Sequence, residues 1–490
     1  MKKMFFAALA ATMMFASCNK EDISGNGGVG AEGPDTKMGL TITLPSTVNA
    51  RDVNPEPSTV NATSEESTIS TIYVFIYKND GTEAKGNGTE LSISDFTNMG
   101  GGVHELLDAK RVEATAGDRR IYVVANIPAG LTSIPATEGA LKVLIEDWNT
   151  VAESWSMGSG GKFVMSSIRA DKNLIAEEYD VPASSSVNVL NVDLNRIMSK
   201  VTVTASAPGS KLLQKFDAIP GLELEYFVEA FTTGQVAKTA YLIQNINPIT
   251  NLLVTPDNNR TGHVPSDAVG KASFVNVTPS DGGIPTLPTM NTFKYIGENY
   301  PESGTYNDAT YVMIRTHVAP NRVASADASG TITWAAASFT AGDDLWMVRS
   351  LTLGSTWFCK SETDADVLGS ALSLAKNGNH GSGEVEIYKY NGAKVYFTAL
   401  INHDRPAGKE GVVYRNQYIQ IDVTAIRDNV FKGMPGNPTD TTGDTPPDPE
   451  DPKNPDPWEP TDPIVEPPAG LHLNVTVAPW NYIANEIILQ

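Results

Sequence analysis

Apolar and polar residues alternate in short runs along this chain, which is the pattern of half-buried β-strands. One such run ends at Pro45, and its apolar members are Met38, Leu40, Ile42 and Leu44. A second run lies near the other end, and its apolar members are Leu471, Leu473, Val475 and Val477. A period of two places these side chains on one face of a strand. The pattern therefore predicts two matching strands at opposite ends of the sequence.

Between these two runs the strand pattern recurs, and helical periodicity is nearly absent. Further strands are predicted at 69–77, 120–126, 201–204, 310–318 and 418–423. Alternating runs at 385–388 and 395–399 flank Asn391-Gly392, a pair typical of two-residue hairpin turns. One helix is predicted around 140–152. Many short strands without strand–helix alternation predict an all-β fold of antiparallel sandwiches.

The first 18 residues have the pattern of an export signal. Lys2 and Lys3 precede an apolar stretch at 4–16, which is too short to span about 30 Å of hydrocarbon. Small residues then precede Cys18, so we expect a lipoprotein signal with Cys18 as the lipidated residue of the mature chain. The alternative is an ordinary signal peptide with an incidental cysteine. The polar, glycine-rich stretch at 21–35 predicts a flexible tether.

Length and charge narrow the classes of function. A chain of 490 residues predicts two domains plus tails. Its 57 acidic and 36 basic residues give a formal charge of -21, which disfavours binding to nucleic acid or to anionic membranes. With Cys18 lipidated, Cys359 has no partner for an internal disulfide, and its apolar surroundings predict a buried strand.

The segment 437–468 differs in composition from the rest of the chain. It contains 11 prolines, nine acidic residues and one basic residue among 32. Such a segment cannot bury a core and favours an extended conformation of about 3.1 Å per residue. The second alternating run follows it directly, so this strand is predicted to sit at the end of a long arm.

No arrangement of residues predicts a catalytic or metal site, and we expect neither enzymatic activity nor a cofactor. Ser373-Leu374-Ala375-Lys376 matches a serine–lysine pattern, but no Lys-Thr-Gly partner occurs. The aspartate pairs Asp343-Asp344 and Asp364/Asp366 lack the spacing of a calcium loop and are expected in solvated loops. The histidines have no metal-ligand spacing; they are His104, His263, His317, His380, His403 and His472.

The two matching runs suggest a mechanism of assembly. Arg51, the first arginine of the chain, follows the N-terminal run. A protease cutting between Arg51 and Asp52 would release that strand with the lipid and leave an apolar groove. The C-terminal strand of another copy could enter the groove by strand addition, and repeated head-to-tail contacts form a filament. The alternative is that both runs are ordinary edge strands of one chain.

Several motifs resemble the major fimbrial subunit family of the Bacteroidetes, the FimA-type and Mfa-type subunits of type V pili. The resemblance runs in order along the chain, from Cys18 and its acidic neighbours to the terminal strand and Trp480. The motifs between these ends are 69–77 with Asp80-Gly81, Gly117 with 121–126, 163–166, 192–201 and 413–418. Gln417 stands where the family usually has a histidine, which argues against a metal there.

The resemblance implies a fold, a processing step and partners. The fold is two transthyretin-like antiparallel β-sandwich domains in tandem. The implied segments are the signal peptide at 1–18, a tether and N-terminal strand at 19–51, domains at 52–198 and 199–436, a linker at 437–470 and a donor strand at 471–490. A trypsin-like or gingipain-like protease would cut after Arg51, and donor strand exchange with other copies and related subunits would build a surface fimbria. Only the lipid of the precursor would contact the outer membrane.

Two other classes of function stay open from the sequence. The chain could be a fimbrial tip or anchor subunit. It could also be an anchored lipoprotein that binds glycans through exposed aromatic residues, for which the candidates are Trp148, Trp155, Trp334 and Trp346. For a fimbrial subunit, a host glycan or protein receptor is a further expected partner.

Overall fold

The fold is built almost entirely from β-strands. The structure, a computed structural model, describes residues 32–44, 64–127, 131, 133–147, 163–176, 187–206, 212–216, 219, 221–234, 236–237, 239–246, 253–255, 274–276, 278–280, 293–300, 309–327, 329, 331–340, 342–350, 353, 355–371, 376–377, 385–401, 412–426, 431, 433–437, 440–445 and 471–479. The predicted all-β class is confirmed.

The N-terminal part consists of two sheets around one hydrophobic core. The first sheet has the order β11-β1-β5-β4, with β6 also paired to β1; its strands are β1 (Asp35–Thr43), β4 (Phe96–Gly100), β5 (Val103–Leu106), β6 (Val112–Thr115) and β11 (Val189–Asp193). The second has the order β12-β9-β7-β2-β3, with β10 on β7; its strands are β2 (Thr71–Lys78), β3 (Thr89–Ser92), β7 (Gly117–Ala125), β9 (Met165–Ser166), β10 (Ala170–Leu174) and β12 (Asn195–Arg196). Short helical turns lie at α1 (Ser64–Ser67), η1 (Ile93–Asp95), η2 (Asp108–Lys110) and α2 (Glu138–Lys142).

Two further sheets enclose a second core. One has the order β20-β13-β30-β32, with β21 on β13; its strands are β13 (Met198–Ser206), β20 (Thr278–Ser280), β21 (Lys294–Gly297), β30 (Gln417–Ile426) and β32 (Leu471–Pro479). The other has the order β14-β15-β22-β29-β31, with β19 on β15; its strands are β14 (Leu212–Lys215), β15 (Glu223–Gly234), β19 (Val275–Asn276), β22 (Tyr311–Pro320), β29 (Lys394–Leu400) and β31 (Met434–Pro435).

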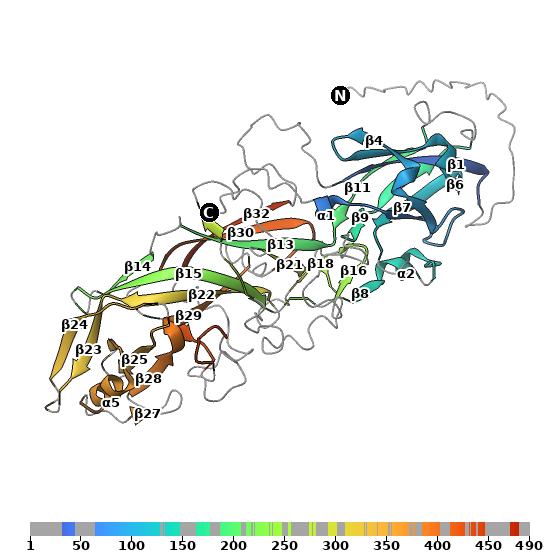
Figure 1. Cartoon of the computed structure of the whole chain (residues 1–490). Helices are drawn as coiled ribbons and strands as arrows, with labels where there is room; N and C mark the ends of the chain where they lie inside the picture. The colour runs from blue at the N-terminus through green and yellow to red at the C-terminus, as the bar shows by residue number, and fades with distance from the viewer. Residues whose placement is uncertain are drawn as a thin grey trace, which may run out of the picture.

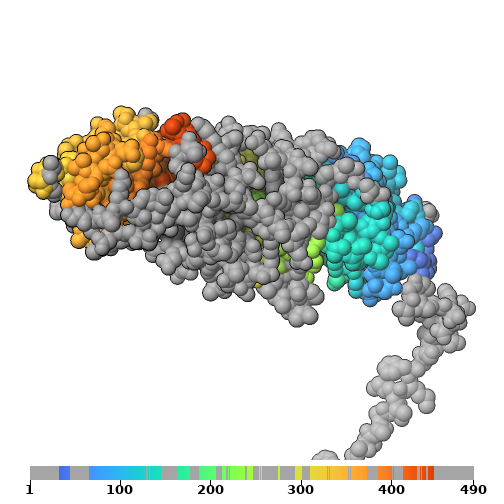
Figure 2. All heavy atoms as spheres, turned by 90° about the horizontal axis from the view of Figure 1, so that it is seen from below, coloured from blue at the N-terminus to red at the C-terminus, as the bar shows by residue number. Residues whose placement is uncertain are grey.

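A smaller unit lies at the end of the molecule opposite to the N-terminal sheets (Figures 1 and 2). It comprises the hairpin of β23 (Arg322–Ala326) and β24 (Ile332–Ala336), a sheet of order β26-β25-β28-β27 and one helix, which surround a separate apolar cluster. Its other elements are β25 (Leu345–Ser350), β26 (Ser355–Cys359), α5 (Glu362–Ala371), β27 (Lys376–Asn377) and β28 (Val385–Tyr390). Two small pairs complete the described strands: β8 (Ile145–Asp147) with β16 (Thr239–Tyr241), and β17 (Asn245–Ile246) with β18 (Leu253–Val254).

Among the described strands, four pairs are parallel, in sheets that are otherwise antiparallel. They are β1 with β11, β13 with β30, β13 with β20, and β27 with β28. In the first three pairs the partners are distant in sequence, so no hairpin turn forces them to run in opposite directions. Alternation along a strand reveals which face is buried but not the direction of the partner, so the sequence did not predict these pairs.

The hairpin predicted at 385–399 is wrong, although both of its strands exist. β28 pairs with β25 and β27, whereas β29 pairs with β22 and β31. Between them the short turn η7 (Asn391–Ala393) passes the chain from one sheet to the other, with Gly392 at φ 59° and Ala393 at φ 50°. The Asp344 carboxylate accepts the Gly392 N–H at 2.9 Å, and this contact from outside the turn holds the corner.

The helices also differ from prediction. The helix expected around 140–152 is the single turn α2, and β8 follows it. Asp364 and Asp366, expected in a loop, lie on α5. Ser361 and Asp364 form reciprocal contacts at the start of this helix, with the Asp364 N–H donating to Ser361 Oγ at 3.1 Å. Ser361-Glu362-Thr363-Asp364 is a capping pattern in the sequence and could have revealed the helix.

Candidate functional site

Strand β1 is an interior strand of its sheet. It pairs in parallel with β11 on one side, where Gly39 lies opposite Val189 and Thr43 opposite Asp193. On its other side it pairs with β6 through its first half and with β5 through its second half. Removing β1 would therefore leave two unpaired strand edges with a groove between them. The alternative that this run is an edge strand is wrong.

The alternating apolar side chains of β1 and Leu44 fill the N-terminal core. Met38 and Ile42 are 0% exposed, Leu40 is 1% exposed and Leu44 is 7% exposed. Burial of each such side chain contributes about 1.5 to 3 kcal/mol before ordering costs. An exposed groove that lacks these four side chains would be strongly unfavourable in water. The groove would therefore favour the binding of another apolar strand.

The inward-facing position before Met38 is polar. Thr36 is fully buried, and its hydroxyl donates to the Ile175 carbonyl at 2.8 Å. The side-chain amide of buried Asn188 donates to Thr36 Oγ1 at 3.0 Å and to the same carbonyl at 2.9 Å. Asn188 Oδ1 also accepts the Ile175 N–H at 2.9 Å. The groove is therefore polar at one end and apolar along the rest of its length.

Strand β32 lies in a different sheet from β1, at an edge. It pairs only with β30 in the described sheet, antiparallel, with Val475 opposite Ile421 and Val477 opposite Ile419. Within one chain the two matching strands therefore occupy separate places. β32 is the outermost strand of its sheet, so its departure would open only one edge, that of β30.

A buried charge pair joins the two halves of the molecule. Glu66 on α1 and Lys200 on β13 are 0% exposed, and Lys200 Nζ lies 2.8 Å from Glu66 Oε1. The Tyr295 hydroxyl donates to the same oxygen at 2.5 Å. Burial lowers the pKa of Lys200, and the Glu66 carboxylate opposes this shift. Burial also lowers the pKa of Arg196 to about 10, and its Nε donates to the Glu66 carbonyl at 2.7 Å.

The motif at 413–418 supplies a second connection across the same junction. Arg415 Nη2 lies 2.6 Å from Glu298 Oε2, and Arg415 Nη1 donates to Ser166 Oγ on β9 at 2.8 Å. Asn416 donates from its side chain to Asn195 Oδ1 at 3.0 Å. Sequence reasoning singled out the basic residues but missed Glu66 and Glu298, because nothing local marks a carboxylate whose partner is more than a hundred residues away.

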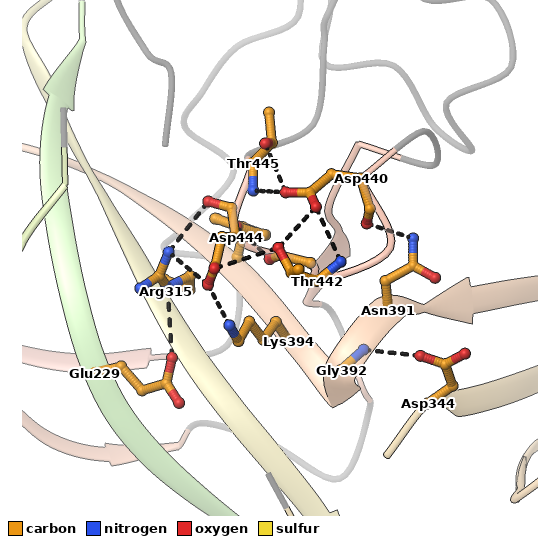
Figure 3. Close-up of polar contacts among 12 residues, drawn as sticks. Glu229, Arg315, Asp344, Asn391, Gly392, Lys394, Asp440, Thr442, Asp444 and Thr445 are labelled. Carbon is orange, nitrogen blue, oxygen red and sulfur yellow. Dashed lines mark hydrogen bonds and ion pairs between the residues drawn. The ribbon is translucent and has the colours of Figure 1, made fainter. Parts of the chain in front are cut away.

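The fold continues through Thr445, inside the segment expected to be a linker. Asp440 accepts hydrogen bonds from the backbone and hydroxyl groups of Thr442 and Thr445 at 2.7 to 2.9 Å (Figure 3). Burial would raise the pKa of Asp440, but these hydrogen bonds hold it well below its usual range. Asp444 pairs with Lys394 and with Arg315, whose Nη1 lies 3.2 Å away (Figure 3). This loop fixes the root of the proline-rich arm to β22 and β29.

No chemistry beyond structural contacts gathers in the part of the chain that the structure describes. Within it, no group of three or more histidine, cysteine or acidic residues could hold a metal ion. None of the described helices is long and apolar enough to cross a membrane. Cys359 is fully buried, and burial raises its pKa to about 12, so it is a core residue. Trp334 and Trp346 are partly buried against the apolar cluster of the distal unit.

Several predicted site residues lie outside the described residues. They are Cys18, Arg51, Asp52 and Trp480, together with Trp148, Trp155 and residues 373–375 of the serine–lysine pattern. For Leu471, Leu473, Val475 and Val477 the strand pairing is described. Lipidation, cleavage and donor function stay predictions.

Part of the chain matches a known protein family. Residues 38–210 match the family described as "Major fimbrial subunit protein (FimA)", a segment that begins at the first apolar residue of β1. No curated protein matches this sequence.

Solved structures match most of this chain at low sequence identity. A candidate cell adhesion protein from Parabacteroides distasonis ATCC 8503 is 14% identical with a TM-score of 0.46, covering 92% of this chain and 98% of its own. A fimbrilin (fimA) from Porphyromonas gingivalis W83 is 14% identical with a TM-score of 0.39, covering 92% and 99%. The tip fimbrial protein Mfa3 from Porphyromonas gingivalis, truncated at its C-terminus, is 12% identical with a TM-score of 0.36, covering 81% and 96%.

Proposed function

Residues 38–210 carry the signature of the major fimbrial subunit protein (FimA) family, and from this premise we propose that the chain is a structural subunit of a cell-surface fimbria that supports adhesion. It is exported as a lipoprotein attached through Cys18 and held in the outer membrane as a precursor. A trypsin-like or gingipain-like protease cuts after Arg51. The freed groove then accepts the C-terminal strand of another copy or of a related subunit. The family is described as one of structural subunits, and no enzymatic activity is proposed.

The observation that carries this proposal is the position of β1. It is an interior strand that contributes four buried side chains, yet it lies before the predicted cut while all other described strands lie after it. The first described element after the predicted cut is α1, where Glu66 is fixed by the buried pair with Lys200. Cleavage after Arg51 would thus remove one complete interior strand and leave the rest of the chain anchored through α1.

The C-terminal end supports the same proposal. β32 repeats the alternation of β1, lies at an edge and follows the proline-rich stretch beyond Thr445. Main-chain pairing with two open edges would give affinity, and four apolar side chains would give specificity. Each subunit offers one groove and one strand, so contacts are head to tail and the polymer does not close.

The N-terminus of surface material tests the proposal. Sequencing of fimbriae sheared from cells should find Asp52 as the first residue. The variant Arg51→Gln should retain the lipid and form no fibres. Arg51→Lys separates the two protease classes, because a trypsin-like enzyme cuts after lysine and an arginine-specific one does not. Sheared wild-type fibres that still begin at lipidated Cys18 would refute the cleavage step.

The C-terminal strand is tested separately by deletion. A chain lacking residues 471–490 should be exported and cut but should stay monomeric, whereas normal fibres from it would refute strand donation. The N-terminal measurement and the position of the chain along the fibre distinguish the alternative subunit types. An anchor keeps its lipid, and a tip is found once per fibre rather than along its length. An anchored glycan-binding lipoprotein would stay uncleaved and bind a glycan array as a monomer.

A further inference from the structure

We infer that the donor strand of a second copy enters the β1 groove in the same direction as β1, with Leu471 in the place of Met38. This inference rests on the function proposed above and specifies its register. In this register Leu473, Val475 and Val477 take the places of Leu40, Ile42 and Leu44. It also aligns Thr476 with Thr43 and Pro467 with Pro34.

The direction and the register follow from the hydrogen bonds that β1 makes with its neighbours. The Pro34 carbonyl accepts the Ala116 N–H at 2.8 Å, and no N–H is needed from position 34, so Pro467 fits there. In an antiparallel ladder, every second pair of opposite residues exchanges hydrogen bonds. Position 34 belongs to such a pair, so position 36 forms the next hydrogen-bonded pair with β6. In a donor strand of the reverse direction, the residues with inward side chains would turn their N–H and C=O groups from β6 towards β11, so the hydrogen bonds that β1 makes with its neighbours would not be reproduced. In a strand of the same direction as β1, a proline at position 36 would remove a ladder hydrogen bond with β6.

A register in which the donor strand is shifted by two residues along the groove is also excluded. It would align Gly470 with Gly39, which is attractive because a Cβ at Gly39 would lie 3.2 Å from Val189 Cγ2. However, it puts Pro467 at position 36 and leaves only Ala469 to fill the fully buried site of Met38. In the inferred register His472 replaces Gly39, and its Cβ requires the half-buried Val189 side chain to move.

The inferred register has one polar mismatch, and this mismatch favours β1 over the donor. Ala469 takes the place of Thr36, so the Asn188 amide and the Ile175 carbonyl lose the hydroxyl that they contact in the precursor. A buried polar group that loses a partner is costly. The uncut chain therefore prefers its own strand, and the donor strand enters only after β1 has been cut away.

Cross-linking of full-length subunits on cells tests the register. Thr43 pairs with Asp193 on β11, so Thr476 of the donor should face Asp193 of the acceptor. The variant carrying Asp193→Cys and Thr476→Cys should give a ladder of disulfide-linked subunits. Asp193→Cys with His472→Cys reports the reverse direction, and Asp193→Cys with Asn474→Cys reports the shifted register. Asp193 is exposed, and the native Cys359 is buried.

Each outcome is decisive. A covalent ladder from the Thr476 pair alone supports the inference. A ladder from either other pair, or normal fibres with no ladder from any pair, overturns the register but keeps strand exchange. Failure of the parent chain to polymerise through its C-terminal strand would instead overturn the proposed function.

The polar mismatch has its own test. Ala469→Thr should restore the hydroxyl in the donor strand, and one hydrogen bond should slow the dissociation of sheared fibres in detergent by roughly fivefold. Ala469→Val is the matched control, because valine has nearly the shape of threonine without the hydroxyl. Equal dissociation rates for the two variants would refute the contact with Asn188.

Discussion

At the scale of single residues, buried charge is what connects the two halves of this molecule. Glu66 and Lys200 are fully buried and 2.8 Å apart, and Arg415 pairs with Glu298 at 2.6 Å with both side chains 4% exposed. Such pairs add little net stability when complete, but a lone buried charge is very unfavourable. The Glu66–Lys200 pair therefore specifies how the halves dock, because each half supplies one of its two charges, whereas Arg415 and Glu298 lie in the same half and Arg415 contacts the other half through Ser166.

The Glu66 and Lys200 pair gives a prediction about stability. Lys200→Met should lower the free energy of unfolding by about 3 to 5 kcal/mol, because it leaves the Glu66 carboxylate buried without its cation. The double variant with Glu66→Gln should recover much of this loss. Urea unfolding of each variant measures the effect. Lys215→Met, which breaks an exposed pair with Glu223, is the control and should cost less than about 1 kcal/mol.

Glu138 gives a prediction about pH. Burial would raise its pKa, but hydrogen bonds from Lys142, Tyr122 and Arg120 lower the pKa from 4.5 to about 2. The folded chain thus binds this proton less readily than the unfolded chain does. The resulting stability is fully present above pH 4.5 and is lost as the pH falls towards 2. Glu138→Gln should therefore destabilise the protein near neutral pH but hardly at all near pH 2. A difference between variant and parent that does not change with pH would contradict this.

At the scale of elements, the alternation of apolar and polar residues locates a strand, whereas contacts with other elements decide which strands it pairs with. The alternation at 38–44 located β1 and its buried face, and both are confirmed. The run at 385–399 likewise located β28 and β29, but the expected hairpin is wrong because the partners of these strands lie elsewhere. Asn391-Gly392 permits a tight turn in either arrangement. Only contacts from Asp344 and Asp440 select the corner.

Strand β1 allows a test that separates precursor from polymer. Ile42→Ala should destabilise the uncut precursor by about 2 to 5 kcal/mol, because it leaves a cavity in the N-terminal core. The same substitution should leave the melting temperature of mature fibres unchanged, since β1 is absent from them under the proposed function. Thr41→Ala, on the half-buried face, is the control. A drop in fibre stability with Ile42→Ala would indicate that β1 remains in place.

At the scale of the whole molecule, the described parts form an elongated body with the N-terminal sheets and β1 at one end (Figure 1). The N-terminal and C-terminal sheets have separate cores, and the junction pairs hold them together. The loop at Asp440–Thr445, the last described segment before β32, is held to β22 and β29 by the ion pairs of Asp444. A filament built from such units would transmit tension from the donor strand to this loop and through the junction.

The arm root gives a prediction that hydrogen exchange can check. Asp440→Ala with Asp444→Asn removes the carboxylate acceptor of Thr442 and Thr445 and weakens the ion pairs to Arg315 and Lys394. Amides at 440–445 should lose protection, while those of β22 and β29 should keep theirs because their ladder is intact. Loss of protection throughout β29 would mean that the loop supports the sheet itself rather than only the arm.

The sequence by itself determined the all-β class, the position of most strands, which face of β1 is buried and the distinct composition of the arm. These features depend on neighbouring residues, because side-chain period and turn chemistry act over a few positions. Tertiary structure alone decided that β1 is an interior strand, that β28 and β29 lie in different sheets and that Glu66 and Glu298 neutralise buried cations. Each of these depends on residues that are far apart in the chain and meet only when the sheets pack.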